Sequence, residues 1–263
     1  MERSELVRWL EVLAPPTRAA SWDRIGLQVG RDTGAITGVC VSVNPSLAAV
    51  RAARAMGANV LVTHHPLIFK PLAEVRTDRE SGRILAEALA GDLMLYAAHT
   101  NLDVTACNRR LSDLMGWELD QILVPEGRDE DGLPWGLGLW GHLAAPRALD
   151  ALCREVGRTL QARSLRLVRG HDREVATVAV CSGSGGDFWP RVAALGLDLY
   201  ITGEIRYHDA LDAAAHGVCV LEVGHQASEE PVVDVVVGYL RERLPRTVAV
   251  QGFREPEPFE VLS

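Results

Sequence analysis

The chain has 263 residues, of which 48% are apolar and 24% are charged, ordinary values for a globular protein with a sizeable core. Its net charge of −8 and its 5% of aromatic residues argue against a basic nucleic-acid groove and against a base-stacking surface. The sequence has no run of about 18 uncharged apolar residues and no signal-peptide pattern, so we expect a cytoplasmic protein without membrane contact.

Lysine and cysteine usage narrows the possible classes further. Lys70 is the only lysine, so the chain has no GK[ST] phosphate-binding motif, and a Schiff base could form only at Lys70 itself. The five cysteines are scattered and never spaced as CxxC, which predicts small buried apolar residues and not a disulfide framework or a thiolate metal site.

In chain order, the first expected element is an amphipathic helix that Pro15 and Pro16 stop, and strands then alternate with helices. The expected strands cover 36–43, 59–64, 93–99, 174–181, 198–203, 218–223 and 247–253. The expected helices cover 45–57, 78–91, 106–116, 146–160, 188–196, 208–217 and 229–244. This alternation predicts α/β layers with mostly parallel strands.

The two halves of the chain resemble each other. Residues 125–142 are rich in glycine, proline and acid, predict a loop or hairpin, and separate the halves. The segment "AMGANVLVTHHP" aligns with "ALGLDLYITGEI", which matches Gly57, Asn59 and Thr63 with Gly196, Asp198 and Thr202. We therefore predict two similar three-layer α/β lobes, 1–124 and 174–263, joined by a short segment over 125–173.

Four histidines stand where an expected strand stops, namely His64, His65, His99 and His225. Ligands of parallel α/β folds collect outside the carboxyl ends of the strands. Asp103 and Glu229 each follow a strand-end histidine by four residues, so a His-x3-acid pattern occurs once in each half. Separate capping or surface histidines would explain any one of these residues, but the repeated pattern favours a metal site of nitrogen and oxygen ligands.

The adjacent pair His64 and His65 suggests more than one ion. Neighbouring residues of a strand point to opposite faces, so the pair would struggle to chelate a single ion. At a strand end broken by Pro66, each could instead serve one of two ions. We expect two divalent ions per chain (Zn, Fe, Mn, Ni or Co) in one central dinuclear site, with the carboxylates closing the shells.

Three further features are weaker signals. Glu204 and His208 follow the strand at 198–203 and could face the same cleft, but His208 could equally be a supporting residue. The glycine-rich "CSGSGGDF" could offer N–H groups to an anion or simply make a tight turn. Trp22 and Asp23 could belong to the core or to a rim of the site.

The motifs together resemble the Nif-three-like dinuclear-metal proteins, which are often named type-two GTP cyclohydrolase I homologues. They are "SWDRIGLQVG", "VTHHPLIF", "AAHTNLDV", "CSGSGG", "YITGEIRYH" and "EVGHQASE", and the resemblance runs in order from about Trp9 to Leu240. It implies two α/β lobes around the site and a ring-shaped homohexamer. It also implies metal ligation by His64, His65, Asp103, His225 and Glu229, with His99 beside the ions.

The chain departs from the family pattern at two strand ends. Asn44 stands where the family usually has an acid, and Glu204 replaces the aspartate of a TGD motif. The contribution that the acid makes near the site is therefore in question at Asn44.

The leading functional hypothesis is a metal-dependent hydrolase of a nucleotide-like or phosphoester substrate. Two ions would lower the pKa of a bound water toward about 7, and the hydroxide would attack a C=N, amide or phosphoryl centre. His99, Glu204 or His208 would move protons. The alternatives are a non-enzymatic metal-binding or metal-delivery protein and an oligomeric scaffold that binds nucleic acid, against which the acidic total argues.

Overall fold

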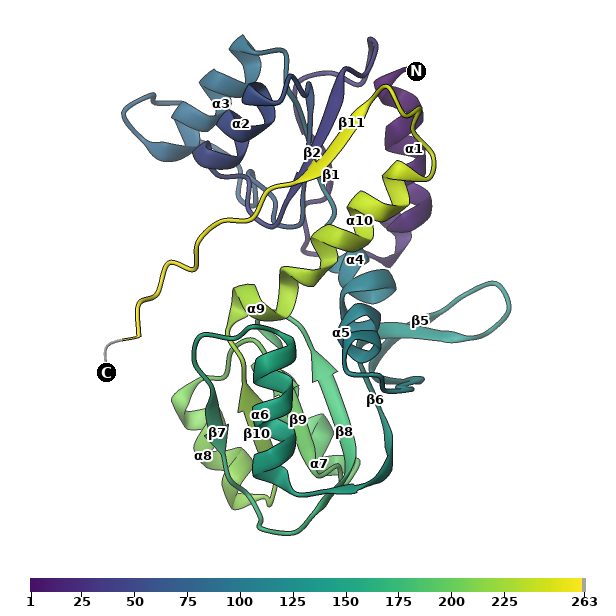
Figure 1. The fold of residues 1–263 in the computed structure, drawn as a ribbon, viewed down its shortest axis with the longest axis vertical. Helices are drawn as coiled ribbons and strands as arrows, with labels where there is room; N and C mark the ends of the chain where they lie inside the picture. Colours follow the sequence, from purple (N-terminus) through teal and green to yellow (C-terminus); the bar gives the residue numbers. More distant parts are fainter. Residues whose placement is uncertain (262–263) are drawn as a thin grey trace. The chain divides into compact units, whose positions relative to one another are not determined.

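The computed structural model describes residues 1–261, and its packing divides the chain into two compact units (Figure 1). Unit 1 contains residues 1–105 and 232–256, and unit 2 contains residues 106–231 and the tail from Glu257. This division differs from the expected lobes because the C-terminal helix α10 (Pro231–Arg241) and strand β11 (Ala249–Gly252) return to unit 1. The two-lobed α/β class itself is confirmed.

Unit 1 is built on a five-stranded sheet in the order β1-β4-β3-β2-β11. Strands β2 (Gly38–Ser42), β3 (Val60–Thr63), β4 (Met94–Ala97) and β11 are parallel, and β1 (Gly26–Val29) pairs antiparallel with β4. Helices α2 (Leu47–Ala55) and α3 (Glu80–Ala90) lie on one side of the sheet, and α1 (Arg3–Leu13) and α10 lie on the other (Figure 1). The unit is therefore a three-layer α/β/α structure.

The strands of unit 1 are nearly continuous apolar runs because both faces of the sheet are covered. Every residue of β2, β3 and β4 is buried. On the α2 and α3 side, Cys40, Leu61 and Leu95 pack with the small helical residues of α2, and alternate residues of each strand face the opposite layer. The carboxyl ends of these three strands are fixed by this packing.

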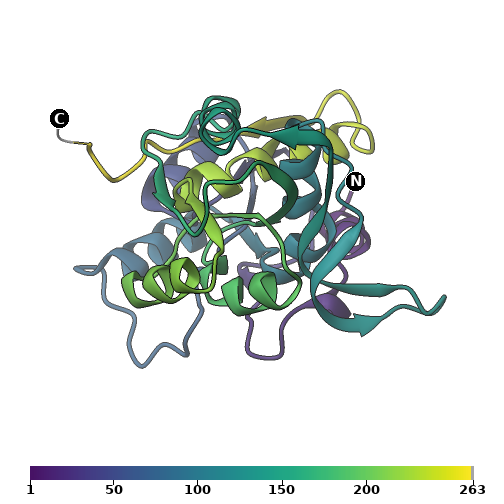
Figure 2. The same ribbon diagram turned by 90° about the horizontal axis from the view of Figure 1, so that it is seen from below.

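Unit 2 is built on a six-stranded sheet in the order β5-β6-β8-β9-β10-β7. Strands β8 (Val175–Cys181), β9 (Leu199–Thr202) and β10 (Cys219–Glu222) are parallel. The other three are antiparallel to their neighbours: β5 (Gln121–Arg128), β6 (Pro134–Arg147) and β7 (Arg166–Val168). Helix α6 (Leu149–Thr159) lies on one side of the sheet, and α7 (Trp189–Ala194) and α8 (Tyr207–Ala215) lie on the other (Figure 2).

The structure confirms the internal repeat at the level of topology. Each unit contains three consecutive parallel strands, β2-β3-β4 and β8-β9-β10, and the last strand of each trio pairs with an antiparallel strand that precedes the trio in the chain. The matched residues Gly57 and Gly196 both adopt the left-handed conformation, with φ of 71° and 66°, where a helix ends and the next strand begins.

Asn59 and Asp198, which the repeat matches, each hold the main chain at the start of a neighbouring strand. The Asn59 Oδ1 accepts from the Thr37 N–H at 3.0 Å, and its Nδ2 donates to the Ala35 carbonyl at 2.9 Å, so Asn59 clamps the chain that enters β2. The Asp198 Oδ2 accepts from the N–H groups of Ala176 and Thr177 at 2.9 and 3.0 Å, at the start of β8. Each side chain thus fixes the register of its central parallel strands.

The elements missed by sequence patterns are short or irregular. Strands β1 and β7 are short edge strands of mostly exposed or half-buried residues, so they lack the apolar run that marks the buried strands. The segment 125–142, expected as a loop or hairpin, belongs to the long β5–β6 hairpin. All five cysteines are buried, as expected. Within residues 1–261, no helix combines the length and apolar character that a membrane crossing needs, and cytoplasmic placement stays a prediction.

We predict that Asp198→Ala lowers the free energy of unfolding by about 1–3 kcal/mol at pH 7, because it leaves two partly buried N–H groups without their acceptor. Burial alone would raise the pKa of Asp198, but hydrogen bonds from Ala176, Arg173 and Thr177 outweigh it and lower the pKa below its ordinary value. The carboxylate therefore stabilises the fold above its unfolded pKa, and this contribution is lost as the pH falls through its folded pKa.

Urea unfolding of the wild type and Asp198→Ala between pH 7 and pH 3 measures this difference, with Asp150→Ala as the control. Asp150 is 54% exposed and pairs with Arg169, so its loss should change little. A difference for Asp198→Ala that is as small as the control, or that persists undiminished at pH 3, would contradict the role of the clamp.

Candidate metal centre

The candidate donors lie at the carboxyl ends of the parallel strands in both units. In unit 1, His64 and His65 follow β3 directly, and His99 follows β4 after one residue. In unit 2, Gly203 and Glu204 follow β9, and His225 opens the short helix α9 (His225–Glu229) after β10. The expected placement of all four histidines at strand ends is confirmed.

The backbone at the end of β3 is held beyond the strand itself. The N–H groups of His64 and His65 donate to the carbonyls of Ser42 and Val43 at 3.1 and 2.8 Å, so the pairing with β2 continues past Thr63. The Thr63 hydroxyl donates to the His65 carbonyl at 2.7 Å. Both imidazoles therefore start from a fixed main chain.

Each histidine of unit 1 donates its Nδ1 proton to a separate acceptor. The His64 Nδ1 lies 3.0 Å from the Ala98 carbonyl, which can only accept, so this nitrogen carries the proton. The His65 Nδ1 lies 2.8 Å from the Asn44 Oδ1. The amide of Asn44 thus supplies a neutral acceptor for His65.

His99 is oriented by Asp23, whose side chain is fully buried. The His99 Nδ1 lies 2.8 Å from the Asp23 Oδ1, and Thr100 donates its N–H to the Asp23 Oδ2 at 3.0 Å. Burial alone would raise the pKa of Asp23, but the hydrogen bonds from His99 and Thr100 outweigh it and lower the pKa to about 2. Asp23 is therefore a permanent carboxylate acceptor for His99.

These three histidines form one cluster, called here the histidine trio (His64, His65 and His99). Their ring centroids are 5.2 to 5.6 Å apart. One ligand nitrogen of each lies within 4.8 Å of the others. With Nδ1 protonated in each ring, Nε2 carries the lone pair that a metal ion requires.

The rings of His64 and His65 lie close together, and their assignment to separate ions stays a prediction. Strand alternation would send the two side chains to opposite faces, but β3 ends at Thr63 and the rings tilt by only 39° at 5.2 Å. The trio is therefore able to offer nitrogens to a common ion as well as to separate ions.

Asp103 joins the trio from the following helical turn. Its Oδ1 lies 3.6 Å from the His64 Nε2, and its N–H donates to the His99 carbonyl at 3.0 Å. Asp103 opens a π-helical turn, a rare conformation that often occurs at functional sites. The first His-x3-acid pattern thus directs its acid to His64, a partner that the spacing alone did not indicate.

In the second His-x3-acid pattern, the acid contacts the histidine of the same pattern, within unit 2. The His225 Nε2 lies 3.1 Å from the Glu229 Oε1 on the same helix, and its Nδ1 lies 2.7 Å from the Glu204 Oε1. Burial alone would lower the pKa of His225, but hydrogen bonds with Glu229 and Glu204 raise it to about 9. An ion held by His225 and Glu229 would take the place of the proton on Nε2.

Gly183 makes room for the Glu229 carboxylate. A Cβ at Gly183 would fall 2.3 Å from the Glu229 Oε1, and the residue has a φ of +62°. Its N–H donates to the Ser228 Oγ at 2.9 Å, and its carbonyl accepts from the Glu204 N–H at 3.1 Å. Of the two readings of the glycine-rich motif, these contacts favour a tight turn that positions Glu204 and Glu229.

The remaining predicted site residues divide between the cluster and the surface. Glu204 is brought to His225 and accepts from the Ser184 hydroxyl at 3.2 Å. His208 is exposed near the start of α8, and its ring contacts Tyr207 at 5.4 Å. Sequence reasoning did not assign Asp23 and Asn44 as acceptors, because nothing in the pattern indicates which histidine each one faces.

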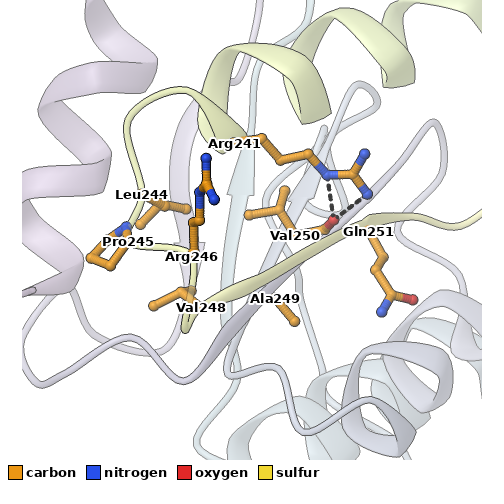
Figure 3. A pocket seen from close by; sticks show the side chains of 8 residues that line it. All are labelled: Arg241, Leu244, Pro245, Arg246, Val248, Ala249, Val250 and Gln251. Carbon is orange, nitrogen blue, oxygen red and sulfur yellow. Dashed lines mark hydrogen bonds between the residues drawn. The ribbon is translucent and has the colours of Figure 1, made fainter.

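A separate hollow of unit 1 lies between the end of α10 and β11 (Figure 3). Its volume is about 390 Å³, and its lining includes Arg241, Arg246 and Gln251. The Arg241 guanidinium donates to the Val250 carbonyl at 2.8 and 3.0 Å, so its charge braces the main chain. The hollow contains no histidine or carboxylate in its lining and is distinct from the donor clusters.

The donor chemistry fits divalent metal ions in both units. Unit 1 offers three oriented imidazoles with an adjacent carboxylate. Unit 2 offers an imidazole and the buried carboxylate of Glu229, for which Gly183 leaves room. Nitrogen and oxygen ligands of this kind suit Zn, Mn, Fe, Co or Ni. The fold and these donors together define a two-lobed α/β protein with candidate metal-binding strand ends.

Comparisons with known proteins identify the family. A model of the Duf34/NIF3 family (NGG1p interacting factor 3) matches residues 1–258, so the chain belongs to this family. A GTP cyclohydrolase 1 type 2 homolog from Streptomyces coelicolor is 32% identical over 246 residues, covering 91% of this chain and 85% of that protein. A protein of the same name from Clostridium perfringens is 29% identical over 265 residues, covering 100% of this chain and 100% of that protein.

The fold comparison agrees with the sequence comparison. The crystal structure of a Bacillus cereus protein related to NIF3 superposes with a TM-score of 0.91 at 23% identity, covering 100% of this chain and 99% of that chain. At this identity the likeness establishes the fold alone.

We predict that Gly183→Ala reduces the zinc content of the purified, zinc-loaded protein, because its methyl group would displace the Glu229 carboxylate. Gly196→Ala is the matched control: its φ of +66° imposes the same backbone strain, but its Cβ would meet nothing within 4 Å. Elemental analysis and urea unfolding of both variants separate the two effects. Equal zinc content in Gly183→Ala and Gly196→Ala would contradict the claim that Gly183 leaves room for the Glu229 carboxylate.

Proposed function

We propose that the chain binds two divalent metal ions and uses them in a hydrolytic reaction on a nucleotide-like or phosphoester substrate. The ligands are His64, His65 and Asp103 of unit 1, and His225 and Glu229 of unit 2. The observation that carries this proposal is the histidine trio, in which three Nδ1 protons are each directed to an acceptor and one ligand nitrogen of each ring lies within 4.8 Å of the others.

Such orientation is what metal-binding histidines need. A ligating imidazole almost always donates its other ring proton to a carbonyl or carboxylate, which fixes the tautomer and raises the basicity of the ligand nitrogen. Asp23 does this for His99 with a full negative charge, whereas Asn44 and the Ala98 carbonyl do it for His65 and His64 with neutral dipoles. His99 is therefore the one member of the trio whose Nδ1 proton faces a carboxylate.

A divalent ion in such a site supplies Lewis acidity, by which it polarises a carbonyl or phosphoryl oxygen and acidifies water. The chain's own residues supply orientation and proton transfer. His99, backed by Asp23, is placed to accept a proton at Nε2, and Glu204 holds the His225 Nδ1 proton. The names of the curated relatives suggest opening of a purine ring as one hydrolytic reaction to test.

A non-enzymatic metal-binding or metal-delivery protein is the second candidate function. It uses the same donors and differs only in the absence of turnover. Homo-oligomerisation, implied by the family resemblance, stays a prediction that native mass spectrometry can test.

We predict that the wild type, after reloading with Zn²⁺, holds two ions per chain by elemental analysis, and that His65→Ala and Asp103→Ala each lose at least one. His142→Ala is the control, since His142 lies exposed on β6. Fewer than one ion per chain in the well-folded wild type would overturn the proposal. Hydrolysis of GTP, other nucleotides or phosphodiesters that is lost in both variants identifies an enzyme; metal binding without turnover identifies a carrier.

A further inference from the structure

Two large aromatic side chains, called here the aromatic pair (Trp22 and Phe69), stand exposed beside the histidine trio. Trp22 is 56% exposed and Phe69 is 42% exposed. Trp22 precedes Asp23, the acceptor for His99, and Phe69 lies in the loop that follows His65. Large aromatic surface left in water is unfavourable, so its position next to candidate metal ligands requires an explanation.

His99 connects the aromatic pair to the trio. Its ring centroid lies 6.4 Å from those of both Trp22 and Phe69, and the two aromatic rings lie 5.9 Å from each other at 67°. The His99 ring centroid also lies 5.2 Å from that of His64 and 5.6 Å from that of His65. One imidazole therefore borders both an apolar aromatic surface and a set of metal-binding nitrogens.

The apolar surface around the pair is small. Leu72 and Val75 on the same loop are exposed as well, but charged side chains interrupt them, with Glu74 47% and Arg76 50% exposed. A stable protein interface buries about 800 Å² on each partner. Two aromatic side chains bordered by charge suit a smaller and flatter ligand than a second protein.

We infer that Trp22 and Phe69 bind the planar heterocyclic ring of a small ligand whose polar end reaches the histidine trio. Aromatic faces hold planar rings by stacking or by edge-to-face contact, and they tolerate different bases because every base has a π-face. The ring binds at the apolar end, and the group to be hydrolysed lies toward His99. This inference rests on the proposed function, since it names the substrate class of the same site.

The test uses guanosine and adenosine as ring probes and ribose as the probe without a ring, each titrated calorimetrically into the metal-free and the zinc-loaded full-length protein. The variants are Trp22→Leu and Phe69→Leu, which remove a ring, and Trp22→Phe, which keeps one. Phe259→Leu is the matched control, because Phe259 is 76% exposed and lies in the C-terminal tail.

We expect both nucleosides to bind and ribose not to bind. Loss of one stacked ring in Trp22→Leu or Phe69→Leu should weaken nucleoside binding by about fivefold to 150-fold, with Trp22→Phe and Phe259→Leu close to the wild type. The zinc content of every variant should equal that of the wild type.

Three results would overturn the inference: no nucleoside binds, Trp22→Leu binds as tightly as the wild type, or Trp22→Leu changes only the subunit stoichiometry. The last result would make the aromatic pair an interface between copies of the chain. Failure of the proposed function is distinguishable, because it would show as absent zinc while ring binding and its loss in Trp22→Leu persist.

Discussion

The hydrogen bond from each trio histidine to its own acceptor is the interaction on which the candidate site depends. Without the Ala98 carbonyl, Asn44 and Asp23, each imidazole would rotate and exchange tautomers, so Nε2 would not be held as the unprotonated nitrogen for a metal ion. These acceptors are rigid because they lie at the ends of fully buried parallel strands or, for Asp23, because Thr100 and His99 hold the carboxylate from two sides. Core packing thus fixes the strand ends, and the strand ends fix the positions of the donor side chains.

The internal repeat explains how one architecture supplies two different donor sets. Asn59 and Asp198 occupy matched positions and clamp the entry of the strand beside them in the same manner. The matched central strands then end differently, in His64 and His65 in unit 1 and in Gly203 and Glu204 in unit 2. A Cβ at Gly203 would come within 2.5 Å of the Gly183 carbonyl, so unit 2 has backbone where unit 1 has imidazoles.

The sequence predicts the parallel strands, most helices and the strand-end histidines, because apolar runs and repeated motifs carry strong local signals. It does not predict that Asp103 approaches His64, that Asn44 meets His65, or that Asp23 faces His99, because these contacts join residues 20 to 80 positions apart through the fold. The sequence likewise does not predict that α10 and β11 pack in unit 1, because no local pattern indicates which unit a helix or strand joins.

Composition does not exclude a small aromatic surface. The low share of aromatic residues argued against a base-stacking surface, yet two of those few rings lie exposed at His99. Composition averages over the chain, whereas a ligand needs only one or two rings in the correct place.

The most direct test of this account is the tautomer of the trio histidines, measured by ¹⁵N NMR of the metal-free protein and again after addition of Zn²⁺. The structure predicts the Nδ1–H tautomer for His64, His65 and His99 before the metal is added. After zinc is added, the proposed ligands His64 and His65 should shift at Nε2 and not at Nδ1, and the exposed His142 should not change. Protonation at Nε2 in any neutral trio histidine, or zinc-induced shifts at Nδ1, would contradict the account.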